Sequence, residues 1–117
     1  MPQILVTRTG SDDVDWEGLA VALNGVVVEK ANARPEACKT QVVRGEDAAV
    51  GADTVDGVTV VHVMIGLLAG RSDETKAQLT EAVVDLMRKF IGPEDGHRTY
   101  VSAEVRDLDP SYRKDEF

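Results

Sequence analysis

The sequence has a single cysteine, Cys38, among its 117 residues. One thiol cannot form a disulfide within the chain or a cysteine-based metal cluster, so a disulfide-rich fold and a cysteine zinc site are both excluded. No base for a cysteine nucleophile is suggested by the residues near Cys38. We therefore expect Cys38 to be a half-buried structural residue.

Positive charge and long apolar segments are also scarce. The chain has 13 Lys and Arg against 21 Asp and Glu, a formal net charge of −8, which argues against a nucleic-acid partner. The longest nearly uncharged run, VTVVHVMIGLLAG, is too short to cross a bilayer as a helix. The start of the chain lacks the basic and apolar regions of a secretory leader. We therefore expect a cytoplasmic protein with no membrane partner.

The common catalytic and ligand-binding motifs are absent. The sequence has no glycine-rich phosphate loop, no GxSxG, no paired histidines at metal spacing and no CxxC, so we expect no metal site. The two histidines are isolated from each other. His62 lies in the most apolar segment, where a core or interface histidine is favoured over a ligand, and His97 lies in the polar stretch PEDGHR.

The first half of the chain predicts a strand, a helix and a second strand. Residues 4–9 are apolar and β-branched, and apolar residues recur at helical spacing over residues 16–27. The pair Asn24-Gly25 is typical of a hairpin turn, but the apolar face continues across it, which favours a helix. KTQVVR then predicts a strand, and GEDAAVGADTVDG a polar loop or hairpin.

The second half predicts the same order of elements. Residues 58–68 indicate a strand covered on both faces, and Ser72 begins a helix whose apolar stripe reaches Phe90 before Gly92-Pro93 ends it. RTYVSAEV predicts the last strand. We expect an α+β fold in one domain, residues 1–117, with two βαβ repeats at about 1–57 and 58–117. One four-stranded sheet would carry both helices on one face, and its bare apolar face would indicate a subunit contact.

The opening residues MPQILVTR place Pro2 directly before the first strand. A proline tolerates that position because the first residue of a strand need not donate a hydrogen bond, so Pro2 needs no functional explanation. If Met1 is removed, however, Pro2 carries a titratable secondary amine. The strand ends also carry four cations: Arg8, Lys39, Arg44 and Arg71. Of these, Arg71 follows a buried strand and precedes a helix, at the edge where ligands collect in open α/β arrangements.

GRSDETKAQLTEAVV resembles the strand-to-helix segment of the 4-oxalocrotonate tautomerase family. The longer stretch from VHVMIGLLAGRSDETKAQL through SAEVRDLDPSYRK resembles the 5-carboxymethyl-2-hydroxymuconate isomerases of the same superfamily. With Pro2, the resemblance covers the N-terminus and nearly all of the second half, while residues 10–57 match only loosely. It implies βαβ repeats, a homotrimer and no cofactor.

The resemblance also implies roles for individual residues. Pro2, exposed by loss of Met1, would be the catalytic base, and Arg71 would bind the carboxylate of a small-molecule substrate. Lys39, in KTQV, falls about where the isomerases carry an arginine in a similar R-S-R-V stretch, and a lysine keeps the charge but not the planar bidentate fork. The implied reaction converts a 2-hydroxydienoate of the muconate type, in the breakdown of aromatic compounds, into its 2-oxo isomer.

Two other classes of protein remain open. A noncatalytic protein of the same fold would bind a small carboxylate or only assemble, and proton transfer on an enol substrate would separate it from an enzyme. An unrelated ferredoxin-like binding domain would not explain Pro2 and GRSDE together, and a trimer in solution would count against it. The sequence leaves the role of the tail PSYRKDEF open, as well as the choice between Lys39 and Arg44 as the second cation.

Overall fold

A four-stranded mixed sheet forms one layer of the molecule. The computed structural model describes residues 2–117, so the expected removal of Met1 lies outside the described residues. The strands are β1 (Gln3–Arg8), β2 (Lys39–Arg44), β5 (Val58–Leu67) and β6 (Arg98–Asp107), in the spatial order β2-β1-β5-β6. β1 runs parallel to β2, β5 runs parallel to β6, and the central pair β1 and β5 is antiparallel. A short hairpin of β3 (Ala49–Val50) and β4 (Asp53–Thr54) forms a separate small sheet.

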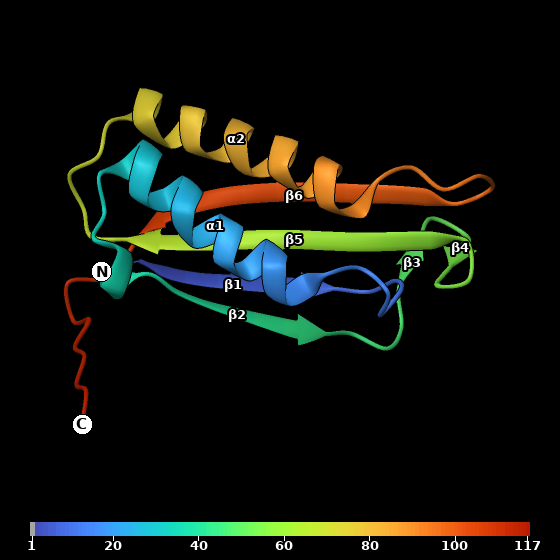
Figure 1. Cartoon of the computed structure of the whole chain (residues 1–117), viewed down its shortest axis with the longest axis horizontal. Helices are drawn as coiled ribbons and strands as arrows, with labels where there is room; N and C mark the ends of the chain where they lie inside the picture. The colour runs from blue at the N-terminus through green and yellow to red at the C-terminus, as the bar shows by residue number, and fades with distance from the viewer. Residues whose placement is uncertain (1) are drawn as a thin grey trace.

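Two helices, α1 (Trp16–Ala31) and α2 (Asp73–Ile91), form the second layer and lie on one face of the sheet (Figure 1). Each helix begins at a side-chain cap: Asp15 accepts a hydrogen bond from the Gly18 N–H, and Ser72 accepts one from the Thr75 N–H. Each connects two parallel strands, which gives the units β1-α1-β2 and β5-α2-β6. The predicted fold class is confirmed: two βαβ repeats share one sheet, with both helices on the same side.

Gly25 does not interrupt α1, which continues to Ala31. A Cβ atom at Gly25 would meet nothing within 4 Å, so the glycine lies on the open side of the helix. Asn24 also has a role within the helix, because its Oδ1 accepts a hydrogen bond from Thr40 Oγ1 at 2.7 Å. The packing of the apolar face therefore outweighs the turn preference of the Asn-Gly pair.

The core lies between the helices and the sheet. The buried face of α1 packs with that of α2 against alternate residues of the two central strands. The largest fully buried side chains of this core are those of Leu19, Leu23, Ile65, Leu67, Leu79 and Met87.

The face of the sheet away from the helices, which the sequence predicts to be apolar, carries both apolar and polar side chains. Strand register places Leu5 and Met64 on this open face, but also Gln41, His62 and Glu104. Along β5, Val60, His62 and Met64 on this open face are half-buried, whereas Val61, Val63, Ile65 and Leu67 on the helix side are fully buried. Neither α-helix of residues 2–117 combines the length and apolar character that a membrane crossing requires.

Candidate functional site

Pro2 lies at the N-terminal end of the central strand β1 and is buried. Its carbonyl oxygen accepts a hydrogen bond from the backbone N–H of Lys39, the first residue of β2, at 3.3 Å. The parallel pairing of β1 and β2 thus places the candidate base beside one of the candidate cations. The Lys39 side chain is exposed, and its Nζ donates to the Ala37 carbonyl oxygen at 2.9 Å.

Arg71 follows the C-terminal end of β5, and the antiparallel pairing of β1 and β5 brings that end to the start of β1. The guanidinium of Arg71 lies against the end of α1: Nε and Nη2 donate to the Ala31 carbonyl oxygen at 3.3 and 3.1 Å, and Nη1 donates to the Leu68 carbonyl oxygen at 3.2 Å. A guanidinium has five N–H groups, so two remain to bind an anion. Arg71 therefore stabilises the C-terminus of α1 while keeping part of its binding capacity.

The three candidate site residues thus lie at one end of the sheet, the left end in Figure 1. The structure does not, however, place them around one cavity of the single chain. A cavity of about 520 Å³ at this end is lined by Arg71 together with Ala31, Asn32 and Ser72, and neither Pro2 nor Lys39 is among its lining residues.

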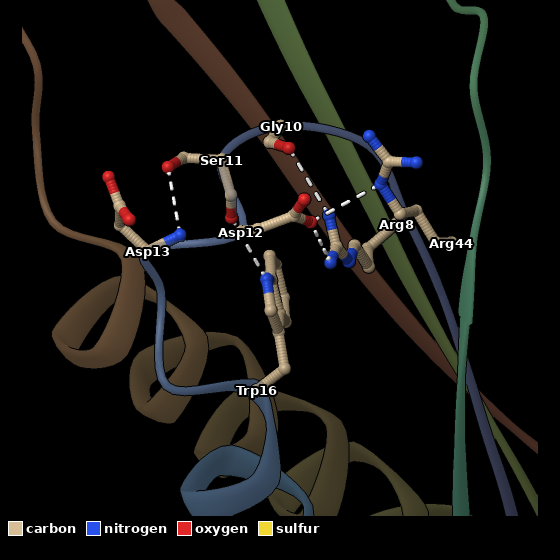
Figure 2. Close-up of polar contacts among 7 residues, drawn as sticks. All are labelled: Arg8, Gly10, Ser11, Asp12, Asp13, Trp16 and Arg44. Carbon is tan, nitrogen blue, oxygen red and sulfur yellow. Dashed lines mark hydrogen bonds and ion pairs between the residues drawn. The ribbon is translucent and has the colours of Figure 1, made fainter.

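Arg8 and Arg44 lie at the opposite end of the sheet, at the C-terminal ends of β1 and β2. Figure 2 shows both guanidinium groups bound to Asp12: Arg8 Nη2 and Arg44 Nε approach its Oδ1 at 2.7 and 3.2 Å. These two contacts lower the pKa of the Asp12 carboxyl, with the hydrogen bond from Arg8 as the main cause. Arg8 is buried and stacks on Trp16, with its Cζ 4.6 Å from the ring centroid.

This arrangement separates Arg44 from Pro2 within one chain. Of the four cations named from the sequence, Lys39 and Arg71 are the two at the Pro2 end, whereas Arg8 and Arg44 hold the turn between β1 and α1 (Figure 2). Within the single chain, Lys39 is therefore better placed than Arg44 to act as a second cation beside Pro2.

Cys38 precedes Lys39 and is buried more deeply than the sequence suggests, with 8% of its surface exposed. Its Sγ donates to the Arg34 carbonyl oxygen at 3.5 Å. Burial raises the pKa of the thiol, because the charged thiolate is poorly solvated there. Cys38 therefore has the environment of an unreactive structural cysteine.

His62 lies on the open face of the sheet rather than in the core. Its Nδ1 lies 2.6 Å from Ser102 Oγ, and its Nε2 lies 3.3 Å from Glu104 Oε1. Arg106 binds the same carboxylate, and the pKa of Glu104 is lowered chiefly by the hydrogen bond from Arg106 and next by that from His62. This cluster is a feature that the sequence did not indicate, because strand pairing brings β5 and β6 side chains together.

The tail after β6, whose role the sequence leaves open, folds back beside the Pro2 end. Gln3 Nε2 donates to Tyr112 Oη at 2.8 Å, and the backbone N–H of Leu108 donates to the Leu67 carbonyl oxygen at 2.7 Å. A groove of about 300 Å³ on the open face lies between this tail and the central strands, with Gln3, Leu5, Met64 and Leu108 among its lining residues.

Several solved structures share this fold. A 5-carboxymethyl-2-hydroxymuconate isomerase from Deinococcus radiodurans R1 is 19% identical over 98% of this chain and 90% of that chain, with a TM-score of 0.83. A wild-type fused 4-OT, a symmetric trimer, is 22% identical over 90% of this chain and 84% of that chain, with a TM-score of 0.70. The protein Pt0534, inactivated by 2-oxo-3-pentynoate, is 12% identical over 90% of this chain and 84% of that chain, with a TM-score of 0.74.

No family model matches the sequence, and no curated protein matches it significantly. The structural similarity extends over nearly the whole chain although sequence identity is low. The chain therefore shares its fold with a 5-carboxymethyl-2-hydroxymuconate isomerase and a 4-OT.

Proposed function

We propose that this protein is a cofactor-independent tautomerase that converts a 2-hydroxydienoate of the muconate type into its 2-oxo isomer. The supporting observation is the position of Pro2: it is buried at the start of a central strand of a tautomerase fold, hydrogen-bonded to Lys39 and at the same end of the sheet as Arg71. After loss of Met1, Pro2 would be the base and the two cations would bind the substrate carboxylate.

The burial of Pro2 suits this role. A free α-amino group titrates near 8, and a secondary amine is more basic, so an exposed terminal proline would be protonated at neutral pH. Burial and nearby cations both disfavour the protonated amine and lower its pKa toward the working range. The neutral amine then takes the proton of the substrate's 2-hydroxyl group and returns it to a carbon of the conjugated system. The reaction is a balanced isomerisation.

The cations have distinct roles in this proposal. The two remaining N–H groups of Arg71 bind a substrate carboxylate, and Lys39 stabilises the negative charge that develops on the 2-oxygen. Lys39 must first release the Ala37 carbonyl, an exchange that an exposed and flexible side chain makes easily. The acidic net charge does not oppose this, because a substrate dianion responds to the local field at the site.

We further propose that the chain acts as a homotrimer. The mixed open face of the sheet provides a surface for a second copy, and a fused 4-OT of the same fold is a symmetric trimer. Because the cavity at Arg71 does not include Pro2, a neighbouring subunit would have to close the site around both residues. Sedimentation velocity at several protein concentrations tests this, and a monomer at micromolar concentration would overturn it.

One observation favours a second candidate, a noncatalytic protein of the same fold that binds a small carboxylate or only assembles. Arg71 directs three of its N–H groups to backbone carbonyls, and Lys39 is also bound to one. In this arrangement the two cations serve the fold itself. Turnover of an enol substrate separates the two candidates, because binding alone would not produce the 2-oxo acid.

The deciding experiment follows the ketonisation of 2-hydroxymuconate by ultraviolet absorbance and maps the N-terminal peptide by mass. We expect methionine-free protein to be active and Pro2→Ala to lose at least about a hundredfold in kcat, the range of a general base. Lys89→Gln, which removes a positive charge at the other end of α2, should leave the rate unchanged. Full activity of Pro2→Ala would remove Pro2 as the base.

A labelling experiment checks the same amine independently. 3-Bromopyruvate should alkylate the Pro2 nitrogen with loss of bromide, and cis,cis-muconate should protect it. Cys38 is the chain's only thiol, and its burial and raised pKa predict that it reacts slowly. Labelling of Cys38→Ala protein at the same rate as wild type would assign the adduct to Pro2. A free but unreactive Pro2 together with no turnover would support the noncatalytic candidate.

A further inference from the structure

A groove of about 380 Å³ lies at the opposite end of the molecule from Pro2. It is formed by the C-terminal turns of α2, the loop after them and the first residues of β6, at the right of Figure 1. Its volume is within the range of small-molecule sites in proteins. The proposed tautomerase reaction makes no use of this groove.

The groove has apolar walls. Val84 and Ile91 from α2 and Val101 from β6 all line it, and each is only partly buried while packing against the core. Apolar side chains left half-exposed on two facing elements can bury the body of a ligand between them. The Gly92-Pro93 step that ends α2 forms part of the same surface.

Two guanidinium groups lie along the groove without protein partners. Arg88 comes from the last turn of α2 and Arg98 from the first residue of β6. Within residues 2–117, the side chains of both arginines make no hydrogen bond or ion pair, whereas Arg8, Arg34, Arg44 and Arg106 are each paired with a carboxylate. The positive charge of Arg88 is favourable near the C-terminus of α2, because it interacts with the helix dipole there. The helix dipole does not explain why Arg98 lines the same groove.

The local charge of the groove is positive in a chain of net charge −8. Glu94 also lines the groove, and its negative charge offsets that of one arginine. Without His97, the lining residues therefore carry one net positive charge. His97 is held in place, because its Nε2 lies 2.6 Å from Oγ1 of the buried residue Thr59. Its other ring nitrogen makes no side-chain hydrogen bond within residues 2–117, so it can serve a ligand.

We propose that this groove binds a small organic anion with an apolar body, such as an aryl carboxylate. Its ring would lie against Val84, Ile91 and Val101, and its carboxylate would be bound by Arg88 and Arg98. Two guanidinium forks from different elements provide paired donors for a carboxylate. The site is distinct from the Pro2 end, so it binds its ligand with no need for a reaction at Pro2.

Titration of the ¹⁵N-labelled protein with sodium phenylacetate, followed by amide chemical shifts, tests the site. We expect saturable shifts confined to residues 84–101 and much smaller shifts with phenylacetamide, which has the same body without the charge. The Pro2→Ala variant should give the same shifts in this region. That result would separate the groove from the proposed active site, whichever way the activity experiment turns out.

Matched variants test the role of the arginines. Arg88→Gln and Arg98→Gln should each weaken phenylacetate binding about tenfold or more, the loss expected for a charged hydrogen bond. Lys89→Gln removes the same charge one residue away, and Lys89 is not among the lining residues of the groove. The phenylacetate affinity of the Lys89→Gln variant should equal that of the wild type. Circular dichroism of each variant checks that the fold is retained.

Three outcomes would overturn the proposal. Phenylacetate and phenylacetamide could shift the same amides equally, which would mean that the arginines do not select the charge. The shifts could fail to saturate, which would mean that the groove binds phenylacetate only weakly and nonspecifically. Lys89→Gln could weaken binding as much as Arg98→Gln, which would mean that net charge rather than this groove attracts the anion.

Discussion

The backbone N–H of Lys39 donates to the carbonyl oxygen of Pro2 at 3.3 Å, so the first residue of β2 is joined directly to the residue that precedes β1. This contact comes from strand pairing and does not depend on the Lys39 side chain. Substitution of Lys39 can therefore change the charge at the Pro2 end while the hydrogen bond and the register of β1 and β2 stay in place.

Within the proposed tautomerase reaction, we expect Lys39→Gln to raise KM for 2-hydroxymuconate by about tenfold or more, because a charged contact to the substrate is lost. Lys39→Arg should retain a KM near the wild-type value, since the positive charge is kept. Steady-state kinetics at constant ionic strength measures both. Equal KM values for Lys39→Gln and wild type would show that the Lys39 charge does not contact substrate.

The Arg8–Asp12–Arg44 contacts predict a pH-dependent contribution to stability (Figure 2). The pKa of Asp12 is lower in the folded protein than in the unfolded chain, so the ionised carboxylate stabilises the fold above the unfolded value near 3.9. This contribution is lost as the pH falls through the folded pKa. We expect Asp12→Asn to lower the urea midpoint at pH 7, and we expect this difference from wild type to disappear as the pH falls through the folded pKa of Asp12.

The matched control for Asp12 is Asp13→Asn, because Asp13 is exposed and its carboxylate makes no ion pair within residues 2–117. Its urea midpoint should follow that of the wild type at every pH. A difference between Asp12→Asn and wild type that stayed constant from pH 7 to pH 3 would show that ionisation of Asp12 does not stabilise the fold.

Gly25→Ala should stabilise the protein. The residue lies inside α1, and an added Cβ would meet nothing within 4 Å, so the substitution gains helix propensity without a steric cost. The expected gain is about 1 kcal/mol in the free energy of unfolding, measured by urea denaturation. Gly70→Ala should do the opposite, because Gly70 has a φ of +123°, where an L side chain is strained. Destabilisation by Gly25→Ala would contradict the helical geometry at this position.

Gly66→Ala should destabilise the fold through its contact with the tail. A Cβ at Gly66 would lie 2.6 Å from Leu108 Cδ2 and 3.3 Å from Leu108 Cγ, so the leucine would have to move. Overpacking in a well-packed core costs about 1 to 3 kcal/mol, and we expect a loss near the lower end because the half-buried Leu108 side chain can shift. The double variant Gly66→Ala/Leu108→Ala should recover part of that loss, and urea denaturation of all four proteins in the cycle measures the coupling. Additive losses would show that the two residues are not in contact in solution.

Much of the architecture could be predicted because it depends on local patterns. The apolar spacing from Trp16 predicts α1, Ser72 begins α2, and the Gly92-Pro93 step ends it, each of which the structure confirms. These signals depend on backbone geometry within a few residues of one another. The order of elements then restricts the topology, since each helix connects two parallel strands.

The positions of the charged side chains could not be predicted in the same way. Each of these cations begins, ends or follows a strand: Arg8, Lys39, Arg44 and Arg71. Nothing in their spacing shows which of them share an end of the sheet. The antiparallel pairing of β1 and β5 decides this, by placing Arg71 near Pro2 and Arg8 at the far end. The contact of Arg8 and Arg44 with Asp12 follows from the parallel pairing of β1 and β2.

Local residue preference is thus enough to determine the helices, the strands and their two-fold repetition in this chain, because those features need only short-range hydrogen bonds and a periodic apolar face. Tertiary structure decides the arrangement of charge and the hollows between elements. Arg88 and Arg98 are ten positions apart and become neighbours of one groove only when β6 returns beside α2. The physical reason is that contacts between distant residues depend on strand pairing and packing, which no local pattern encodes.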